Sequence, residues 1–410
     1  MELEKTDPEI SDLIEKEEVR QGNVINLIAS ENYASKAVRE ALGSKLTNKY
    51  SEGYSGRRYY AGNEVIDEVE TLAIERAKKL FGVNFANVQP YSGSPANQAI
   101  YFALAQPGET IMGLALPAGG HLTHGWGVNF SGIYYNAVQY GVDPETELID
   151  FASLERIARE HKPKLIWTGA TAYARIFEWE KFRKIADEIG AYLIADISHI
   201  AGLIISGVHP SPVGIADVIM TTTHKTLRGP RGAIIMTNEE SLAARIDKAV
   251  FPGLQGGPHD NTTAAIAVAL KEAAEAGFKE YGKQVVANAK SLANSLNEGG
   301  LRLVSGGTDN HMVLVDFGED GPSGKEAQDG LSQVNIVVNR NTVPRETRKP
   351  FVTSGVRLGT PAITTRGMKE IEAQKTGELI VKIVKNLGSS AIYSQVQKEV
   401  SNLSSSFPIP

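Results

Sequence analysis

The chain of 410 residues contains no cysteine. This absence excludes disulfides, thiolate nucleophiles and cysteine-based zinc sites, and it fits a reducing compartment. Long apolar runs are also missing, because no stretch approaches the roughly 20 apolar residues that a membrane-spanning helix needs. The polar, acid-rich N-terminus lacks the apolar core of a secretory signal. We therefore expect a cytoplasmic protein without a membrane partner.

Positive charge is in short supply as well, with 42 Lys and Arg against 48 Asp and Glu and a formal net charge of -6. Such a balance argues against a nucleic-acid or anionic-membrane surface. The segment NKYSEGYSGRRYYAGN could stack on single-stranded nucleic acid. Its basic pattern is not repeated elsewhere in an acidic chain, so we expect no nucleic-acid partner. The length exceeds what one hydrophobic core usually serves, and it predicts two domains.

Helical spacing and short apolar runs alternate along the middle of the chain. Over residues 63–82 apolar side chains recur every three or four positions, with Asn63 as N-cap and Gly82 as stop. WEKFRKIADEIG reads as a helix that ends at Gly190, and residues 191–195 read as a strand before Asp196. LIWTGA and DVIMTTTHK are similar apolar runs that end in polar residues. Strands alternating with helices predict an α/β fold with a mostly parallel central sheet flanked by helices.

The character of the sequence changes after about residue 272. Residues 271–300 read as a long amphipathic helical stretch, and LRLVSGGTDNHMVLVDF then reads as a pair of antiparallel strands. We expect an N-terminal arm over 1–45, a large domain over 46–272 and a smaller C-terminal α+β domain over 273–410.

Polar residues follow the predicted strands closely. In open α/β sheets, functional groups gather beyond the carboxyl ends of the strands. The residues that fall there are Thr171, Asp196, His199, His224 and Lys225. A solvated surface lysine and a plain Asp196–Lys225 salt bridge are the simpler interpretations. Both groups would also be satisfied around pyridoxal phosphate, with Lys225 as a Schiff base and Asp196 holding the pyridine nitrogen protonated.

Three further motifs could serve such a site. In PYSGSPANQAI, Ser92, Gly93 and Ser94 precede a proline at the expected first helical position, which makes an anion site at a helix N-terminus. The histidines of GGHLTHG could bind metal, but no nearby carboxylate completes a site, so we expect no metal and a stacking role for His121. Arg357 in SGVRLGTPA suits an amino-acid carboxylate.

Taken together, these motifs resemble serine hydroxymethyltransferase over residues 20–370. The signature-like segments are LIASENY, LTNKYSEGYSGRRYYAGN, GGHLTHG, TTTHKTLRGPRG, FPGLQGGP, SGGTDNH and FVTSGVRLGTPA, in the family's order. The resemblance implies a fold-type I pyridoxal phosphate enzyme, acting as a homodimer whose active sites are shared across the interface. Its activity would be reversible transfer of the serine hydroxymethyl group to tetrahydrofolate, giving glycine and methylenetetrahydrofolate in one-carbon metabolism.

The resemblance also implies a role for each matching residue. The cofactor would contact Lys225, Asp196, His121, His199, Ser92, Gly93, Ser94 and Thr171, and from the partner subunit Tyr50, Gly256 and Gly257. Substrate amino acid and folate would contact Arg357, Ser30, Glu52, Tyr60, His199, Arg231, Leu116, Gly120, Leu122 and Asn341. The catalytic set would be Lys225, Glu52, Asp196, His121, Tyr60, His224 and Thr171.

The sequence departs from the family's pattern at several positions, which bear on cofactor affinity and folate entry. Tyr91 and Pro95 flank the phosphate turn, Ser198 replaces an alanine, and Trp126 with Gly127 replaces Ser-Pro. Alternatives stay open at this point: a β-hydroxy amino acid aldolase, an α-methylserine hydroxymethyltransferase, or a relative that binds the cofactor without catalysis.

Overall fold

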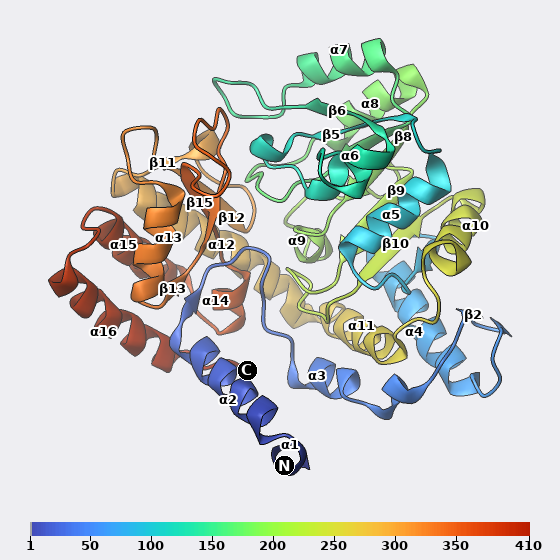
Figure 1. Cartoon of the computed structure of the whole chain (residues 1–410), viewed down its shortest axis with the longest axis horizontal. Helices are drawn as coiled ribbons and strands as arrows, with labels where there is room; N and C mark the ends of the chain where they lie inside the picture. The colour runs from blue at the N-terminus through green and yellow to red at the C-terminus, as the bar shows by residue number, and fades with distance from the viewer. Residues whose placement is uncertain (1) are drawn as a thin grey trace. The chain divides into compact units, whose positions relative to one another are not determined.

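The computed structural model describes residues 2–410. Contacts divide the chain into two compact units, one of Met1–Tyr33 with Gln284–Pro410 and one of Ala34–Lys283. Figure 1 follows the chain through the elements of both units. The first unit joins the two ends of the chain, whereas the three-part division expected from the sequence follows the chain in order; that division stays a prediction.

The unit Ala34–Lys283 is built on a seven-stranded sheet in the order β4-β10-β9-β8-β7-β5-β6. Its strands are β4 (Phe85–Asn87), β5 (Thr110–Leu114), β6 (Asn136–Tyr140), β7 (Leu165–Thr168), β8 (Tyr192–Asp196), β9 (Val218–Thr222) and β10 (Ala233–Thr237). Pairing is parallel from β6 through β9, and β10 runs antiparallel to β9 and β4. The expected α/β fold with a mostly parallel sheet is confirmed.

The rest of this unit consists of helices and a small hairpin. They are α3 (Lys36–Leu42), η1 (Lys45–Asn48), β2 (Gly53–Tyr54), β3 (Arg57–Arg58), α4 (Glu64–Phe81), α5 (Gly93–Leu104), η2 (Leu116–Ala118), η3 (Leu122–His124), α6 (Phe130–Tyr134), α7 (Phe151–His161), α8 (Trp179–Ile189), α9 (Ala201–Ile205), α10 (Glu240–Lys248), η4 (Ala249–Leu254) and α11 (Asp260–Ala273). Helices α4 and α8 end as expected, at Gly82 with φ 73° and Gly190 with φ 70°. A left-handed C-cap favours glycine, which has no Cβ to clash.

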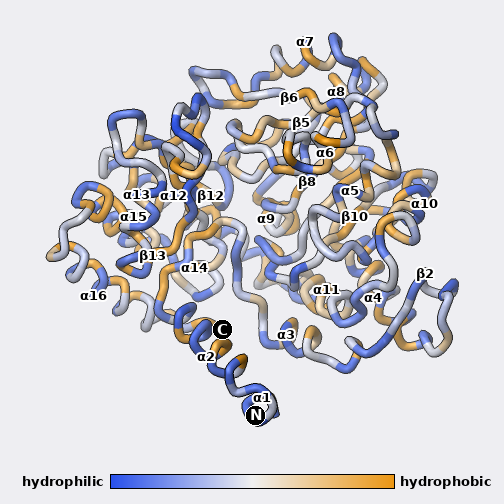
Figure 2. Tube along the Cα trace, in the orientation of Figure 1, coloured by the Kyte–Doolittle hydropathy of each residue, from blue (hydrophilic) through white to orange (hydrophobic). Residues whose placement is uncertain are grey.

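The sheet of this unit is buried on both faces. Leu165 and Trp167 pack in one cluster with Ile100 and Leu104 of α5, while Ile166 and Leu193 are also fully buried. Side chains alternate between faces along a strand, so neighbours that are both buried need cover on both sides. Figure 2 maps the hydropathy of each residue along the trace of the chain. This double cover explains why the strands are continuous apolar runs in the sequence.

The unit of the two chain ends has its own antiparallel sheet, in the order β11-β12-β15-β14. Its elements are α1 (Glu2–Thr6), α2 (Pro8–Asn23), β1 (Ile25–Asn26), β11 (Arg302–Leu303), η5 (Val304–Gly306), β12 (Met312–Asp316), α13 (Gly324–Gln333), β13 (Ile336–Val337), β14 (Asn339–Asn341), β15 (Gly355–Gly359), α14 (Pro361–Thr365), α15 (Glu370–Val384) and α16 (Ser390–Ser406). The antiparallel pair read from the sequence is β11 with β12, and it is confirmed.

The helices differ from the sequence-based expectation in one place, and none of those that the structure describes is suited to a membrane. The stretch 271–300 contains two helices, because α11 ends at Ala273 and α12 (Ala276–Glu298) begins after a turn, and α12 contributes to both units. Within residues 2–410, no helix combines the length and apolar character required to cross a bilayer.

Candidate active site

The carboxyl ends of three adjacent strands carry the polar residues singled out from the sequence. Asp196 is the last residue of β8, His224 and Lys225 follow β9, and Thr171 follows β7. Strands β7, β8 and β9 are neighbours in the sheet and run parallel. The edge of the sheet expected to hold the site does gather these side chains.

Asp196 is buried and accepts three hydrogen bonds. Its Oδ2 lies 3.2 Å from Nε2 of His124 and 3.1 Å from Nδ2 of Asn97, and its Oδ1 lies 3.0 Å from the N–H of Ser198. Burial alone would raise the pKa of this carboxyl, but the hydrogen bond from His124 and the charge of Lys225 hold the pKa well below its ordinary value. Asp196 is therefore an ionised carboxylate at neutral pH.

A chain of hydrogen bonds connects Asp196 with His121. Nδ2 of Asn97 also donates to Oγ1 of Thr123 over 2.8 Å, and this hydroxyl lies 2.7 Å from Nδ1 of His121. The sequence analysis predicted a role for His121 but none for Asn97. It weighed His124 only as a metal ligand. Their signals were weak: a second histidine in GGHLTHG and an asparagine one turn into α5. Only the fold brings both within reach of Asp196.

Glycines let the loops at this edge approach one another. The carbonyl of Gly119 accepts the N–H of Thr171 over 2.7 Å, which joins the loop after β7 to the loop that carries His121. A Cβ added to Gly169, whose φ is 120°, would lie 2.1 Å from the carbonyl oxygen of Asp196. Any side chain at that position would push the two strand ends apart, so glycine is required there.

The loops after β8 and β9 are also tied together next to the lysine. Oγ1 of Thr226 donates to the carbonyl of His199 over 3.1 Å and accepts the N–H of Gly202 over 3.0 Å. Because Thr226 directly follows Lys225, these bonds fix the backbone that carries the lysine. The structure thus brings His199 to the same edge of the sheet as Lys225.

The turn of Ser92, Gly93 and Ser94 forms the first residues of α5. Ser92 is the N-cap and Gly93 begins the helix, so Pro95 is its third residue and not its first as expected. The proline is still tolerated, because the first four N–H groups of a helix have no intrahelical partner. A Cβ on Gly93 would lie 2.7 Å from Cγ2 of Thr222. Oγ1 of Thr222 is buried with no hydrogen-bond partner among residues 2–410. Free N–H groups and an unpaired hydroxyl form a suitable anion cradle.

Two positive charges act on His224. Burial, followed by the charges of Lys225 and Arg231, lowers the pKa of its imidazole to about 3. His224 is therefore neutral at neutral pH and cannot act there as a proton donor of the imidazolium type. Arg231 itself is exposed.

Ser198 shows how one departure from the family pattern is accommodated. Its N–H donates to Asp196, and its Oγ accepts the N–H of Thr222 over 3.0 Å. The serine therefore joins the end of β8 to the end of β9. The substitution leaves the carboxylate and the lysine in place.

A second group of predicted residues lies around two glycines of the loop before α11. Tyr50 donates to Oε1 of Glu52 over 3.2 Å, which raises the pKa of the Tyr50 phenol. A Cβ on Gly256 would lie 3.1 Å from that oxygen, and one on Gly257 would lie 3.3 Å from Cζ of Tyr50. The rings of Tyr50 and Tyr60 meet edge to face at 5.0 Å. Tyr50, Glu52, Tyr60, Gly256 and Gly257 thus form one cluster.

Tyr91 connects the helix-start turn with this cluster. Its OH donates to the carbonyl of Gly257 over 2.8 Å, and its ring stacks on His259 with centroids 4.2 Å apart. Its N–H donates to Oε1 of Gln255 over 3.0 Å. This second departure fixes the loop 255–259 next to Ser92.

Three of the four folate-contact residues named from the sequence lie on or between two short helical turns near His121. Leu116 begins η2 and Leu122 begins η3. Gly120 stands where a Cβ would be 1.8 Å from the carbonyl oxygen of Leu114, so no other residue fits there. Leu122 is exposed, as a ligand contact requires.

The unit of the chain ends contains the remaining predicted residues. Arg357 on β15 is buried, and its Nε donates to Oδ1 of Asn339 over 3.0 Å. Burial lowers the pKa of its guanidinium to about 10, so Arg357 stays charged at neutral pH. Asn341 lies on the paired strand β14. Ser30 follows Ala29, which packs closely on Gly359 of β15. A Cβ added to Gly359 would lie 2.4 Å from Cα of Ala29. These three residues gather around β15.

Across residues 2–410, no group of three or more acidic or imidazole side chains is arranged to hold a metal ion. The site instead has an ionised carboxylate, a lysine and an anion cradle at the carboxyl edge of a mostly parallel sheet. This is the architecture of the fold-type I pyridoxal phosphate-dependent transferases.

Comparisons with known proteins narrow this class. The sequence model of a family described as serine hydroxymethyltransferase matches residues 3–380. A serine hydroxymethyltransferase of Acidothermus cellulolyticus is 56% identical over 414 residues, covering 100% of this chain and 97% of the relative. Those of Sorangium cellulosum and Methanosarcina barkeri are 55% identical, covering 100% and 99% of this chain and 96% and 99% of the relatives. The chain belongs to the serine hydroxymethyltransferase family.

Proposed function

We propose that this chain catalyses reversible transfer of the hydroxymethyl group of serine to tetrahydrofolate, with pyridoxal phosphate bound through Lys225. The observation that carries the proposal is the position of Lys225 and the ionised Asp196 at the ends of adjacent strands, beside the N-terminus of α5. The chain belongs to the serine hydroxymethyltransferase family, and it matches relatives of that name over nearly their whole length. Both findings favour this reaction.

The residues present fit the cofactor at each of its ends. The phosphate would take the N–H groups of Gly93 and Ser94 and the unpaired Oγ1 of Thr222, which lies so close to Gly93 that no side chain fits between them. The pyridine nitrogen would face Asp196, whose depressed pKa keeps it ionised and able to hold a proton on the ring. His121 would stack on the ring, and Thr171 with His199 would lie at its phenolic edge.

When bound, pyridoxal phosphate supplies an electron sink for the pair released when a bond to the α-carbon of an amino acid breaks. Asp196 sustains that sink by keeping the ring nitrogen protonated. Lys225 anchors the cofactor covalently and can accept or return a proton at its Nζ. His224 beside it is neutral and contributes no competing acid. Arg231, which helps to keep it so, would lie near the substrate end.

Selection of the bond that breaks depends on orientation of the substrate. Arg357 would hold the α-carboxylate through a bidentate pair, helped by Ser30, and its burial would strengthen this contact. Glu52 and Tyr60 would lie over the reacting carbon, and Leu116, Gly120, Leu122 and Asn341 would contact the folate. Glu52 would pass the proton between substrate hydroxyl and folate.

We further propose a homodimer in which Tyr50, Glu52, Tyr60, Gly256 and Gly257 serve the partner's site. Tyr50 and Tyr60 contact each other and are 53% and 48% exposed, and an exposed aromatic patch of this kind fits a surface that a second copy covers. We also propose a cytoplasmic location and an absence of metal and nucleic acid.

Absorbance spectra with a folate-dependence assay would test the function. The purified protein with pyridoxal phosphate should absorb in the visible, and the spectrum should change with glycine and again with glycine plus tetrahydrofolate. Serine cleavage should require tetrahydrofolate. Cleavage that is equally fast without folate would indicate a β-hydroxy amino acid aldolase, and turnover of α-methylserine alone would indicate the related transferase. Binding without turnover would indicate a non-catalytic relative. The relatives are named serine hydroxymethyltransferase, which favours the folate-dependent transferase over these alternatives.

A further inference from the structure

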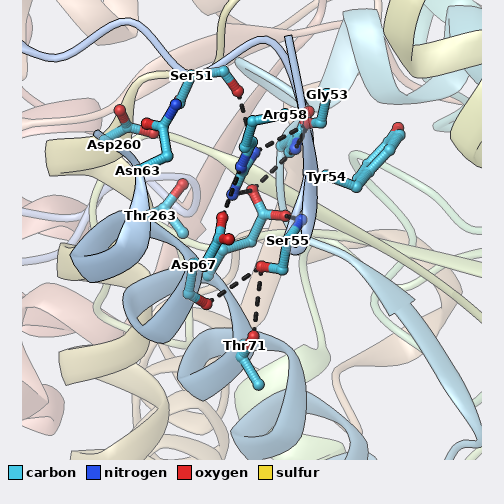
Figure 3. A network of polar contacts seen from close by, with 12 residues as sticks. Ser51, Gly53, Tyr54, Ser55, Arg58, Asn63, Asp67, Thr71, Asp260 and Thr263 are labelled. Atoms are coloured by element: carbon cyan, nitrogen blue, oxygen red, sulfur yellow. Dashed lines mark hydrogen bonds and ion pairs between the residues drawn. The ribbon is translucent and has the colours of Figure 1, made fainter. Parts of the chain in front are cut away.

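Glu52 lies between two carbonyl groups that are held by one buried arginine. Nη1 of Arg58 donates to the carbonyl of Ser51 over 3.0 Å and to that of Gly53 over 2.9 Å. The N–H of Tyr59 also donates to the carbonyl of Glu52 itself over 2.9 Å. Figure 3 shows the side chain of Arg58 reaching Ser51 and Gly53. The backbone on both sides of Glu52 is thus fixed by a single guanidinium.

Two carboxylates hold that guanidinium in place. Nε of Arg58 lies 2.8 Å from Oδ1 of Asp67, and Nη2 lies 3.2 Å from Oε2 of Glu70. The side chains of Arg58 and Glu70 are only 4% and 2% exposed. Burial is the largest influence on Glu70 and raises the pKa of its carboxyl, against the opposing effects of Arg58 and Gln89. Both carboxylates come from α4, a helix of 18 residues.

Neighbouring polar contacts complete the anchor. Nε2 of Gln89 donates to the carbonyl of Gly53 over 2.9 Å and to Oε2 of Glu70 over 2.8 Å. Oγ of Ser51 donates to Oδ1 of Asp260 over 2.7 Å, which ties the segment to the start of α11. A Cβ on Gly53, at φ 99°, would lie 2.4 Å from the carbonyl of Arg57, so the hairpin has no room to shift.

A buried ionic group of this kind is a poor source of stability. The desolvation of two charges offsets most of their attraction, and apolar replacement of a whole ion pair is often neutral or stabilising, although removal of one partner alone destabilises the fold. A planar guanidinium with several fixed donors is well suited, however, to hold two carbonyls in one geometry. The cluster therefore makes physical sense as a device that fixes the conformation of the segment.

We propose that Arg58 is a positioning residue for Glu52, with Asp67 and Glu70 as its counter-charges and Gln89 as the second anchor of Gly53. The proposal rests on the proposed function of Glu52 in the folate-dependent step. Arg58 acts through the backbone on either side of Glu52, and the direction of the Glu52 carboxylate depends on it.

A double-mutant cycle between Arg58→Met and Glu52→Gln tests this coupling. A carboxylate displaced by about 1 Å can cost roughly a hundredfold in rate, so Arg58→Met should lower kcat for tetrahydrofolate-dependent serine cleavage by about ten- to a hundredfold. Its KM for serine and its affinity for pyridoxal phosphate should change by less than about threefold. In the Glu52→Gln background, Arg58→Met should lower the residual rate by less than about twofold.

Conservative and matched variants separate positioning from general stability. Arg58→Lys keeps the charge but has a single nitrogen, which cannot contact both carbonyls and both carboxylates as Nη1, Nε and Nη2 of Arg58 do. Its kcat should therefore fall between those of the wild type and Arg58→Met. Arg183→Met is the control, because Arg183 also pairs with two carboxylates, Asp187 and Asp217, each at 2.8 Å. These lie where α8 and the amino ends of β8 and β9 meet. The control should lower the melting temperature and leave kcat unchanged.

Should Arg58→Met not fold, Gln89→Met replaces it in the cycle, since it removes a donor to Gly53 and no charge. The proposal would be overturned if Arg58→Met lowered kcat by the same factor in the wild-type and Glu52→Gln backgrounds. The same holds for Gln89→Met where it replaces Arg58→Met. An unchanged kcat in a folded Arg58→Met protein would also overturn the proposal. If Glu52→Gln alone retains full serine turnover, the proposed function of Glu52 fails, and this outcome is distinct from failure of the coupling.

Discussion

His124 donates from its Nε2 to Oδ2 of Asp196 over 3.2 Å, and both side chains are buried, at 0% and 9% exposure. The ring of His124 stacks on Trp167 with centroids 5.1 Å apart and an interplanar angle of 19°. Since Trp167 belongs to β7 and Asp196 to β8, the imidazole is held by the sheet itself. His124 therefore holds the carboxylate from a buried position and helps to keep it ionised.

Substitution of His124 should move the acid limit of cofactor binding. Burial would raise the pKa of Asp196, and the hydrogen bond from His124 is the main effect that lowers it. A carboxyl with a depressed pKa contributes its stabilisation above its ordinary pKa and loses it as pH falls through the depressed value. In His124→Ala the pKa of Asp196 rises, so pyridoxal phosphate should be released at a higher pH than in the wild type.

The measurement is a pH titration of the visible absorbance of the bound cofactor, with the exposed His161→Ala as control. An acid midpoint identical in His124→Ala and in the control would show that Asp196 is held ionised by other groups.

Lys225→Ala should lose turnover of serine entirely while the fold is retained. Lys225 lies in a loop tied by Thr226 to His199, and truncation of its side chain leaves those bonds intact. Borohydride reduction of the wild-type holoenzyme followed by peptide mapping should label Lys225. A label on another lysine, or an active Lys225→Ala enzyme, would contradict the assignment.

The sheet and the positions of Lys225, Asp196 and Thr171 were predictable from the sequence, because strand ends and helix stops leave local signals. Apolar runs ending in polar residues identify the carboxyl edge of a parallel sheet without knowledge of any contact. Gly82 and Gly190 likewise predicted the ends of α4 and α8, because the C-cap of a helix often has a positive φ that glycine adopts readily. These features depend on residues a few positions apart.

The partners of Asp196 were not predictable in the same way. Asn97 is 99 positions away from Asp196 and His124 is 72 positions away, and no local pattern relates residues so far apart. The buried Arg58–Glu70 pair was missed for a related reason, since a charge run between tyrosines reads as a solvated loop. The register of α5 was wrong by two residues because Pro95 suggested a later start than the structure has.

Asp196→Asn should slow the reaction by at least roughly a hundredfold, because a neutral amide cannot keep the pyridine nitrogen protonated. The amide can still accept from the N–H of Ser198, so the end of β8 should remain ordered. Steady-state serine cleavage with tetrahydrofolate gives the rate, and circular dichroism reports the fold. Near wild-type activity would assign the ring nitrogen to a different partner.

Arg357→Ala should weaken serine binding by about 2–5 kcal/mol, which is the range for truncation of one side of a buried charge pair. Arg357→Lys should weaken serine binding by a smaller amount, since a lysine keeps the charge but cannot form the bidentate pair. Arg302→Ala on the same sheet is the control, because its pair with Asp316 is exposed on the arginine side. An unchanged KM for serine in Arg357→Ala would place the substrate carboxylate elsewhere.

Glu52→Gln tests the folate-dependent step apart from the cofactor. A glutamine keeps the shape of the side chain and an oxygen that can accept from Tyr50, which now lies 3.2 Å from Oε1 of Glu52. It cannot transfer a proton, so serine turnover with tetrahydrofolate should fall by roughly two to four orders of magnitude. Binding of pyridoxal phosphate and of glycine should stay near wild type.

The assay pairs steady-state serine cleavage with the spectrum of the glycine complex, measured beside the surface control Glu68→Gln. Loss of turnover with a normal glycine spectrum would locate the defect after amino-acid binding, at the proposed proton transfer to the one-carbon unit. A Glu52→Gln enzyme that turns serine over at more than about half the normal rate would show that its carboxylate takes no part in the proton transfer. The hydrogen bond to Tyr50 would then be its only role, and the buried Arg58 cluster would position a structural side chain.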